Sequence, residues 1–184
     1  MRQGNVDEFL FGLYAKFVFG MSRYTYVASE GSPFIFYNTV DGGFVGSDYS
    51  FPNSAANADT LLMLRNALVM EELKDNIETG KISLLAAAPK TWFAQGQKIV
   101  VERLASYAGP ISYRVDSDPA NRVIRANVDA PSGKWSSIEI HLRHPEGGTP
   151  HTVTVNGKPH GDFDLQGRVR LTPGANSYAI EVQY

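Results

Sequence analysis

Residues 98–128 read KIVVERLASYAGPISYRVDSDPANRVIRANV, and this stretch decides the fold of the second half of the chain. Apolar residues occupy alternate positions in three runs, at 99–101, 111–115 and 124–128. A period of two is typical of strands that bury one face. Ala-Gly-Pro and Asp-Pro, which are turn signals, separate the runs. The pattern therefore predicts three consecutive strands.

The same alternation continues to the end of the sequence, in four more runs at 138–142, 153–155, 169–171 and 178–184. Between two of them, Asn156-Gly157 is the strongest short hairpin signal a sequence can carry. Seven strands with one apolar face each predict an antiparallel β-sandwich. We place a domain boundary near residue 96, so that the sandwich domain covers 96–184.

The first 95 residues have a helical character instead. Apolar residues at helical spacing predict a helix over about 5–19. A second helix is predicted to begin at Asn53 or Ser54 and to continue through Glu72 as an apolar segment, before a polar turn at 73–81. The two helices form a hairpin, and the fold class is α+β.

A long connection rich in Gly, Ser, Pro and aromatic residues separates these helices, at 22–52. Its composition predicts short strands at 25–28 and 34–37. A loop of this length inside a compact domain is usually functional or disordered, and its many aromatic residues argue against disorder.

The second helix has more apolar surface than the chain can readily cover. A helix that is apolar over most of its circumference is normally buried, and a helical hairpin buries only one face of each helix. The hairpin is therefore expected to pack on the sandwich, to self-associate, or to belong to a longer protein. Met1 lies four residues before the first helix, which favours the longer protein.

Composition excludes several classes of function. The net charge is −2, which gives no basis for a nucleic-acid partner. The absence of cysteine excludes disulfides and thiolate chemistry. The apolar segment at 9–20 is interrupted by Lys16 and is too short to span a bilayer, so it predicts a surface helix and no membrane partner. The compartment stays open.

Five segments carry a resemblance to a known family: MRQGNVDEFLFGLYAKFVFGMSRYTYVASEGSP at 1–33, FPNSAANADTLLMLRNALVMEE at 51–72, LLAAAPKTWFAQGQKIVVERLASYAGPISYRVDS at 84–117, IEIHLRHP at 138–145, and VTVNGKP at 153–159. Together they resemble the C-terminal part of bacterial six-hairpin glycosidases, in which an (α/α)6 toroid precedes a β-sandwich. The resemblance implies that the second helix is an inner toroid helix and that the loops before it face the sugar cleft. It implies part of a glycoside hydrolase acting on plant- or microbe-derived glycans, inactive when isolated.

Glycoside hydrolysis commonly needs two carboxyl groups, and the aromatic loop offers one candidate. Glu30 lies in ASEGS, beside a glycine that permits close approach of a ligand; a solvated loop carboxylate explains it as well. The second carboxyl group would come from sequence outside this chain. A non-catalytic carbohydrate-binding or structural interaction module is the alternative function.

Residues expected to contact sugar lie in the loop and at the start of the second helix: Tyr26, Tyr37, Asn53, Ser54 and Asn57. The tyrosines can stack on sugar rings or form the core of the loop itself. The polar residues can bond sugar hydroxyls, although helix capping explains Asn53 and Ser54 equally well.

No cofactor and no metal site are predicted. The four histidines lie in the β-rich half, and no acidic cluster accompanies them in sequence: His141, His144, His151 and His160. Structural and catalytic metals need a fuller set of ligands than this.

Overall fold

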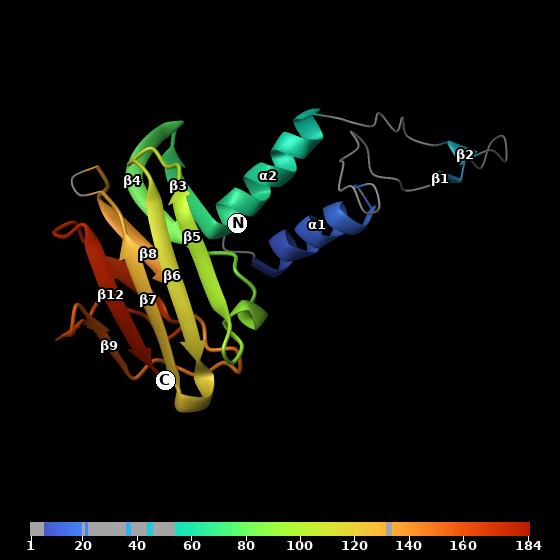
Figure 1. Cartoon of the computed structure of the whole chain (residues 1–184). Coiled ribbons are helices and arrows are strands. Elements are labelled where there is room, and N and C mark those ends of the chain that lie inside the picture. Colours follow the sequence, from blue (N-terminus) through green and yellow to red (C-terminus); the bar gives the residue numbers. More distant parts are fainter. Residues whose placement is uncertain (1–5, 20, 22–35, 38–43, 46–53, 132–133) are drawn as a thin grey trace. The chain divides into compact units, whose positions relative to one another are not determined.

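The computed structural model describes residues 6–19, 21, 36–37, 44–45, 54–131 and 134–184. The chain divides into two compact units, Met1–Arg65 and Asn66–Tyr184 (Figure 1). Each unit is considered by itself.

The first unit contains helix α1, at Val6–Phe19, and most of helix α2, at Ser54–Leu68. Both predicted helix starts are confirmed to within one residue. A two-stranded ribbon pairs β1, at Phe36–Tyr37, with β2, at Phe44–Val45. The strand predicted at 25–28 lies outside the described residues.

Both helices present large apolar side chains to solvent. Phe11 is 78% exposed, Val18 68% and Leu61 67%. On α2, burial below a few per cent is confined to Thr60 and Ala67 within the part of the chain that the structure describes. The described residues therefore leave much of the apolar surface of α2 uncovered, and the toroid stays a prediction.

The predicted end of the second helix is wrong by four residues. Helix α2 ends at Leu68 and the chain continues directly as strand β3, at Val69–Lys74, and strand β4, at Ile77–Leu84. The polar segment contributes a two-residue hairpin turn, Asp75 and Asn76, with φ of 52° and 63°. Positive φ at both turn residues matches the right-handed twist of paired strands, so the chain reverses as a hairpin.

The second unit is built on two β-sheets (Figure 1). The six-stranded sheet has the order β10-β9-β12-β7-β6-β5 and is antiparallel throughout. Its strands are β5 Lys98–Leu104, β6 Ile111–Asp118, β7 Val123–Asp129, β9 Thr152–Val155, β10 Lys158–Pro159 and β12 Ser177–Gln183. The hairpin predicted at Asn156-Gly157 is confirmed, with φ of 51° and 73°.

The four-stranded sheet has the order β11-β8-β4-β3. It consists of β3, β4, β8 at Ser137–His141 and β11 at Arg168–Leu171. The pair β4–β8 is parallel and the other two pairs are antiparallel. All seven runs of alternating apolar residues thus coincide with strands, and β3, β4 and β10 are additional to them.

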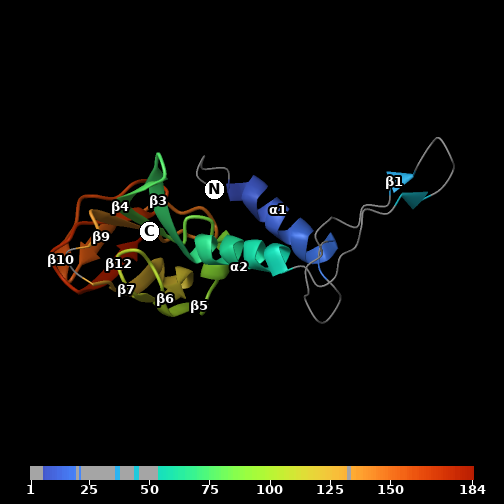
Figure 2. The same cartoon turned by 90° about the horizontal axis from the view of Figure 1, so that it is seen from above.

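One hydrophobic core joins the two sheets. It combines side chains of the four-stranded sheet, such as Leu84 and Ile138, with Ile111 and Ile124 of the six-stranded sheet, all fully buried. Figure 2 shows β3 and β4 on one side of this core and β5, β6 and β7 on the other. Strands β3 and β4 supply core residues, and the second compact unit covers Asn66–Tyr184. The domain boundary expected near residue 96 stays a prediction.

Residues between β4 and β5 close one side of the core. The short helix η1, at Lys90–Phe93, buries Phe93 completely. Among the described residues, no helix has the length and apolar character needed to cross a membrane.

Candidate functional site

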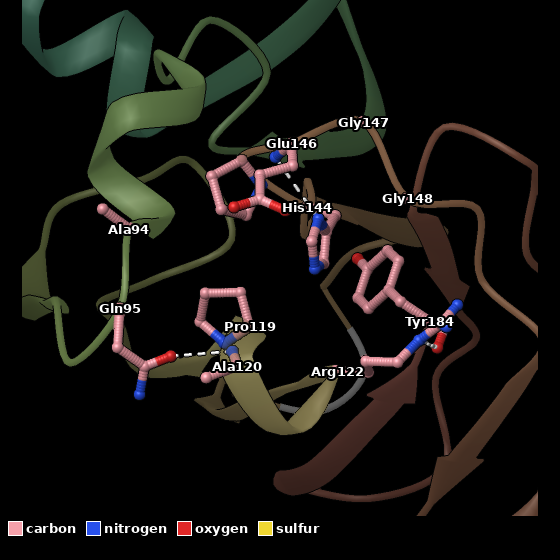
Figure 3. A pocket seen from close by; sticks show the side chains of 11 residues that line it. Ala94, Gln95, Pro119, Ala120, Arg122, His144, Glu146, Gly147, Gly148 and Tyr184 are labelled. Atoms are coloured by element: carbon pink, nitrogen blue, oxygen red, sulfur yellow. Dashed lines mark hydrogen bonds between the residues drawn. The ribbon is translucent and has the colours of Figure 1, made fainter.

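A pocket of about 680 Å³ opens in the second unit (Figure 3). Loops from distant parts of the sequence line it: the segment after η1, the short helix η2 at Pro119–Asn121, the loop after β8, and Tyr184 after β12. The lining residues are Ala94, Gln95, Pro119, Ala120, Arg122, His144, Pro145, Glu146, Gly147, Gly148 and Tyr184. We call it the His144 pocket.

His144 is held in one orientation by three neighbours. Its ring lies against the ring of Tyr184, with centroids 5.1 Å apart and planes tilted by 51°. The backbone N–H of Glu146 donates to its Nδ1 at 3.3 Å. At Gly148, a Cβ would approach the His144 Cγ to 3.0 Å, so the glycine leaves the space that the ring occupies. The side chain is therefore clamped and only 8% exposed.

The remaining nitrogen of His144 faces the pocket. Figure 3 shows Nε2 directed into the open space between Glu146, Pro119 and Tyr184, and no described residue bonds it. Because Nδ1 accepts a hydrogen bond, the neutral ring carries its proton on Nε2. His144 therefore presents a hydrogen-bond donor to whatever occupies the pocket.

Tyr184 has a structural role in this wall. Its hydroxyl donates to the carbonyl of Leu142, and burial raises the pKa of the phenol well above its usual value. Its backbone N–H donates to the Arg122 carbonyl at 2.9 Å, and its carbonyl accepts from Nε of Arg122. Tyr184 is thus buried and hydrogen-bonded at its hydroxyl, its N–H and its carbonyl, and its ring supports the ring of His144.

Gln95 organises the opposite wall. Its Oε1 accepts from the N–H of Ala120 at 2.8 Å, and its Nε2 donates to Asp118 at 2.8 Å. Asn121 donates to the other oxygen of Asp118, and these side-chain hydrogen bonds, that of Asn121 first, lower the pKa of Asp118. The Asp118 carboxylate and the Gln95 amide are thus both bonded within the protein, and these bonds hold η2 in this wall.

The two charged groups of the pocket have opposite signs. Arg122 donates from Nε to Tyr184, and its Nη2 lies 3.3 Å from Nε2 of His151. Glu146 is exposed, and its carboxylate has no bonding partner among the described residues. One free carboxylate does not provide the acid and base pair of glycoside hydrolysis.

The six residues predicted to form a sugar site all belong to the first unit. Tyr26, Glu30 and Asn53 lie outside the described residues. Tyr37 pairs with Phe44 between β1 and β2, and its side chain is outside the description. Their roles stay predictions.

The other two predicted contacts are described. Ser54 is the first residue of α2 and is exposed, whereas Asn57 lies one turn later and is half-buried. Neither residue is among those that line the His144 pocket. Within the described ranges, no group of three or more His, Cys, Asp or Glu side chains is placed to hold a metal ion.

Sequence reasoning missed the His144 pocket. The signal available was the loop HPEGG at 144–148, where a histidine and a glutamate flank a proline before two glycines. Such a loop between strands permits close approach of a ligand. Gln95 and Tyr184 carry no local signal, because only the packing of the two sheets brings them to this loop.

No protein-family model matches this sequence, and no curated protein matches it. Among solved structures, the chain is similar to Ara127N-Se, a GH127 beta-L-arabinofuranosidase from Geobacillus stearothermophilus T6, with a TM-score of 0.35 and 13% sequence identity. The match covers 75% of this chain and 20% of the arabinofuranosidase chain, so this chain spans about a fifth of that enzyme's length.

Proposed function

We propose that this chain is the C-terminal part of a glycoside hydrolase that acts on plant- or microbe-derived glycans. In this proposal the two-sheet unit is an accessory β-sandwich. The helices and the aromatic loop complete an (α/α)6 toroid and line its sugar cleft, with Tyr26, Tyr37 and Glu30 among the cleft residues.

One observation carries the proposal. Helix α2 exposes large adjacent apolar side chains, Leu61 at 67% and Leu62 at 53%, and then leads directly into the sandwich. An apolar helix surface of this kind requires neighbouring elements. Further helical hairpins of a toroid would supply them, and the order of helices followed by a sandwich agrees with the sequence resemblance.

Catalysis would then depend on residues beyond those described. The His144 pocket contains one free carboxylate, whereas acid and base or nucleophile functions need two. We therefore expect the isolated chain to hydrolyse no glycoside. In the complete enzyme, Glu30 is our candidate for one of the two groups.

Sequencing the coding region upstream of Met1, and assaying its product, tests the proposal. The longer protein and the isolated chain would be compared on a panel of aryl glycosides. We expect in-frame helical hairpins upstream, turnover by the longer protein, and none by the isolated chain. An upstream region without helical hairpins, or a longer protein without turnover, would contradict the proposal.

Glu30 is tested in the longer protein. Glu30→Gln is expected to lower kcat by about 10²–10⁴-fold if the carboxyl group transfers a proton in the reaction. Glu78→Gln, at an exposed position in β4, is the matched control and should leave kcat unchanged. Equal activities of the two variants would remove Glu30 from the reaction.

A non-catalytic carbohydrate-binding module is the second candidate, and the His144 pocket favours it. The His144 ring and the Glu146 carboxylate face one open space, where the lining offers no second carboxyl group. This function predicts glycan binding by the isolated chain and no turnover by any longer product of the gene.

A further inference from the structure

We propose that the His144 pocket binds a neutral, polyhydroxylated ligand, a sugar ring of a free saccharide or of a glycan chain. The choice of carbohydrate rests on the proposed function. The existence of a binding site rests on the geometry of the pocket alone.

The first step is that His144 is built to meet a ligand. Buried polar atoms are normally hydrogen-bonded, and a side chain that is 8% exposed has almost no other access to water than this opening. The protein holds the ring through Tyr184, Gly148 and the Glu146 backbone, and leaves Nε2–H directed at the cavity. A donor fixed in this way is ready to meet an acceptor that enters the pocket.

The charges that line the pocket favour a neutral ligand. An anion would be attracted by Arg122 but repelled by the carboxylate of Glu146. A cation would be attracted by Glu146 but repelled by Arg122. Arg122 is moreover engaged with Tyr184 and His151. A neutral ligand avoids an uncompensated charge on either side.

The third step concerns hydrogen-bonding chemistry. The pocket offers a donor at His144 Nε2 and an acceptor at the Glu146 carboxylate. A hydroxyl group both donates and accepts, so a ring bearing several hydroxyls can satisfy both groups at once. A carboxylate can accept from two neighbouring hydroxyls of the same ring.

The size and apolar lining of the pocket suit a sugar ring. Four apolar residues, Ala94, Pro119, Ala120 and Pro145, stand between the polar groups and offer contacts to the C–H bonds of a sugar ring. A volume of about 680 Å³ lies within the usual range of small-molecule sites, about 300–1,000 Å³. The pocket therefore has room for one ring or for a short saccharide.

Side-chain NMR of the histidines in the full 184-residue chain provides the test. The probes are glucose, galactose, xylose and arabinose, followed by cellobiose and xylobiose. We expect saturable shifts of the His144 imidazole resonances, with His160 as an internal reference because it bonds the Arg170 carbonyl away from the pocket. Saturation by the monosaccharides identifies a free saccharide as the ligand, and saturation by the disaccharides alone identifies a glycan chain.

Variants locate the binding. Glu146→Gln should weaken binding by about tenfold or more, since hydrogen bonds to a charged acceptor exceed neutral ones by about this factor. Glu102→Gln, at an exposed position on β5, is the control and should bind as the natural chain does. His144→Gln serves to assign the resonance. The test does not depend on the folding of this variant, because Glu146 is exposed and its substitution does not disturb the buried histidine.

Three results would overturn the proposal: no saturable shift with any saccharide, a shift of equal size in Glu146→Gln, or a stronger response to acetate and sulfate than to every saccharide. Failure here is distinct from failure of the proposed function, which is read by turnover of the longer protein. Turnover without sugar shifts refutes the pocket alone, and sugar shifts without a hydrolase refute the enzyme alone.

Discussion

At the scale of single residues, Gly167 occupies the most crowded glycine position in the described part of the sandwich. Its φ is +80°, and a Cβ there would lie 1.9 Å from the carbonyl oxygen of Leu142. The Gly167 carbonyl in turn accepts from the N–H of Leu142 at 2.8 Å. The backbone at Gly167 therefore cannot move away from Leu142 without losing this bond. We expect Gly167→Ala to lower the free energy of unfolding by about 2–4 kcal/mol, measured by urea denaturation.

Gly157 is the matched control for this substitution. It has a similar φ of +73°, but no atom lies within 4 Å of the position that an added Cβ would take. Gly157→Ala should therefore cost only the left-handed backbone penalty, about 1 kcal/mol. Equal losses in the two variants would show that crowding against Leu142 is not the cause.

His141 gives the protein a pH-dependent stability. Its Nε2 is buried without a partner among the described residues, and its Nδ1 lies 3.2 Å from Nη2 of Arg143. Burial, aided by the Arg143 charge, lowers the pKa of His141 from 6.5 to about 4, while Glu139 and Asp164 act in the opposite direction. The folded histidine thus stays neutral at pH values where the unfolded one is protonated.

The sign follows from proton binding. Between pH 6.5 and about 4 the unfolded state binds more protons at His141, so this contribution to stability is lost as the pH falls through that window. The loss should reach about 3 kcal/mol and then level off. His141→Gln should flatten the stability profile between these pH values, whereas His151→Gln, at an exposed position, should keep it. A profile unchanged by His141→Gln would refute this account.

At the scale of elements, the sandwich has two possible N-terminal limits, which differ in whether the β3–β4 hairpin belongs to it. Strand β4 lies between β3 and β8, and Val69, Ile82 and Leu84 are at most 2% exposed. We expect residues 66–184 to unfold cooperatively by circular dichroism. Residues 96–184 should show no cooperative transition, because removing buried apolar side chains costs about 2–5 kcal/mol each against a total stability of about 5–15 kcal/mol.

The shorter fragment also loses Phe93 and leaves one edge of β8 unpaired. A cooperative transition for residues 96–184 would contradict this prediction and favour the boundary near residue 96. The content of secondary structure in both fragments, compared with that of the full chain, serves as the control.

Elements differ in how far the sequence predicts them. Strands β5 to β9 alternate clearly because one face meets the core and the other meets solvent. Strand β3 escapes prediction, since VMEELK has charges on successive residues and its partner strand β4 follows after only two residues. Helical propensity of Met, Glu, Leu and Lys favours a continued helix there, and pairing with β4 and β8 overrides it.

The candidate site follows the same logic. The loop at 144–148 is visible in the sequence as a turn, but its meaning depends on contacts over long sequence distances. His144 gains its orientation from Tyr184, and the facing wall comes from Gln95 through its bond to Ala120. Local patterns contain no information about such pairs. The packing of the two sheets brings the loop after β8 to Tyr184, and the pairing of β5 with β6 brings Gln95 to Ala120.

At the scale of the whole molecule, the exposed helix surfaces decide between a self-sufficient chain and a part of something larger. Phe11, Val18 and Leu61 are each at least two-thirds exposed. Large apolar side chains exposed to solvent promote association. We expect the 184-residue chain to show a concentration-dependent mass by size-exclusion chromatography with light scattering, and residues 66–184 to remain monomeric.

The double variant Phe11→Ser and Leu61→Ser should reduce the association of the full chain. Ile77→Ser, which replaces a residue that is 72% exposed in the second unit, is the control and should not. A full chain that stays monomeric at every concentration would mean that its helices need no further neighbours. The proposal that the helices belong to the toroid of a longer protein would then lose its basis. The His144 pocket would become the first place to look for function.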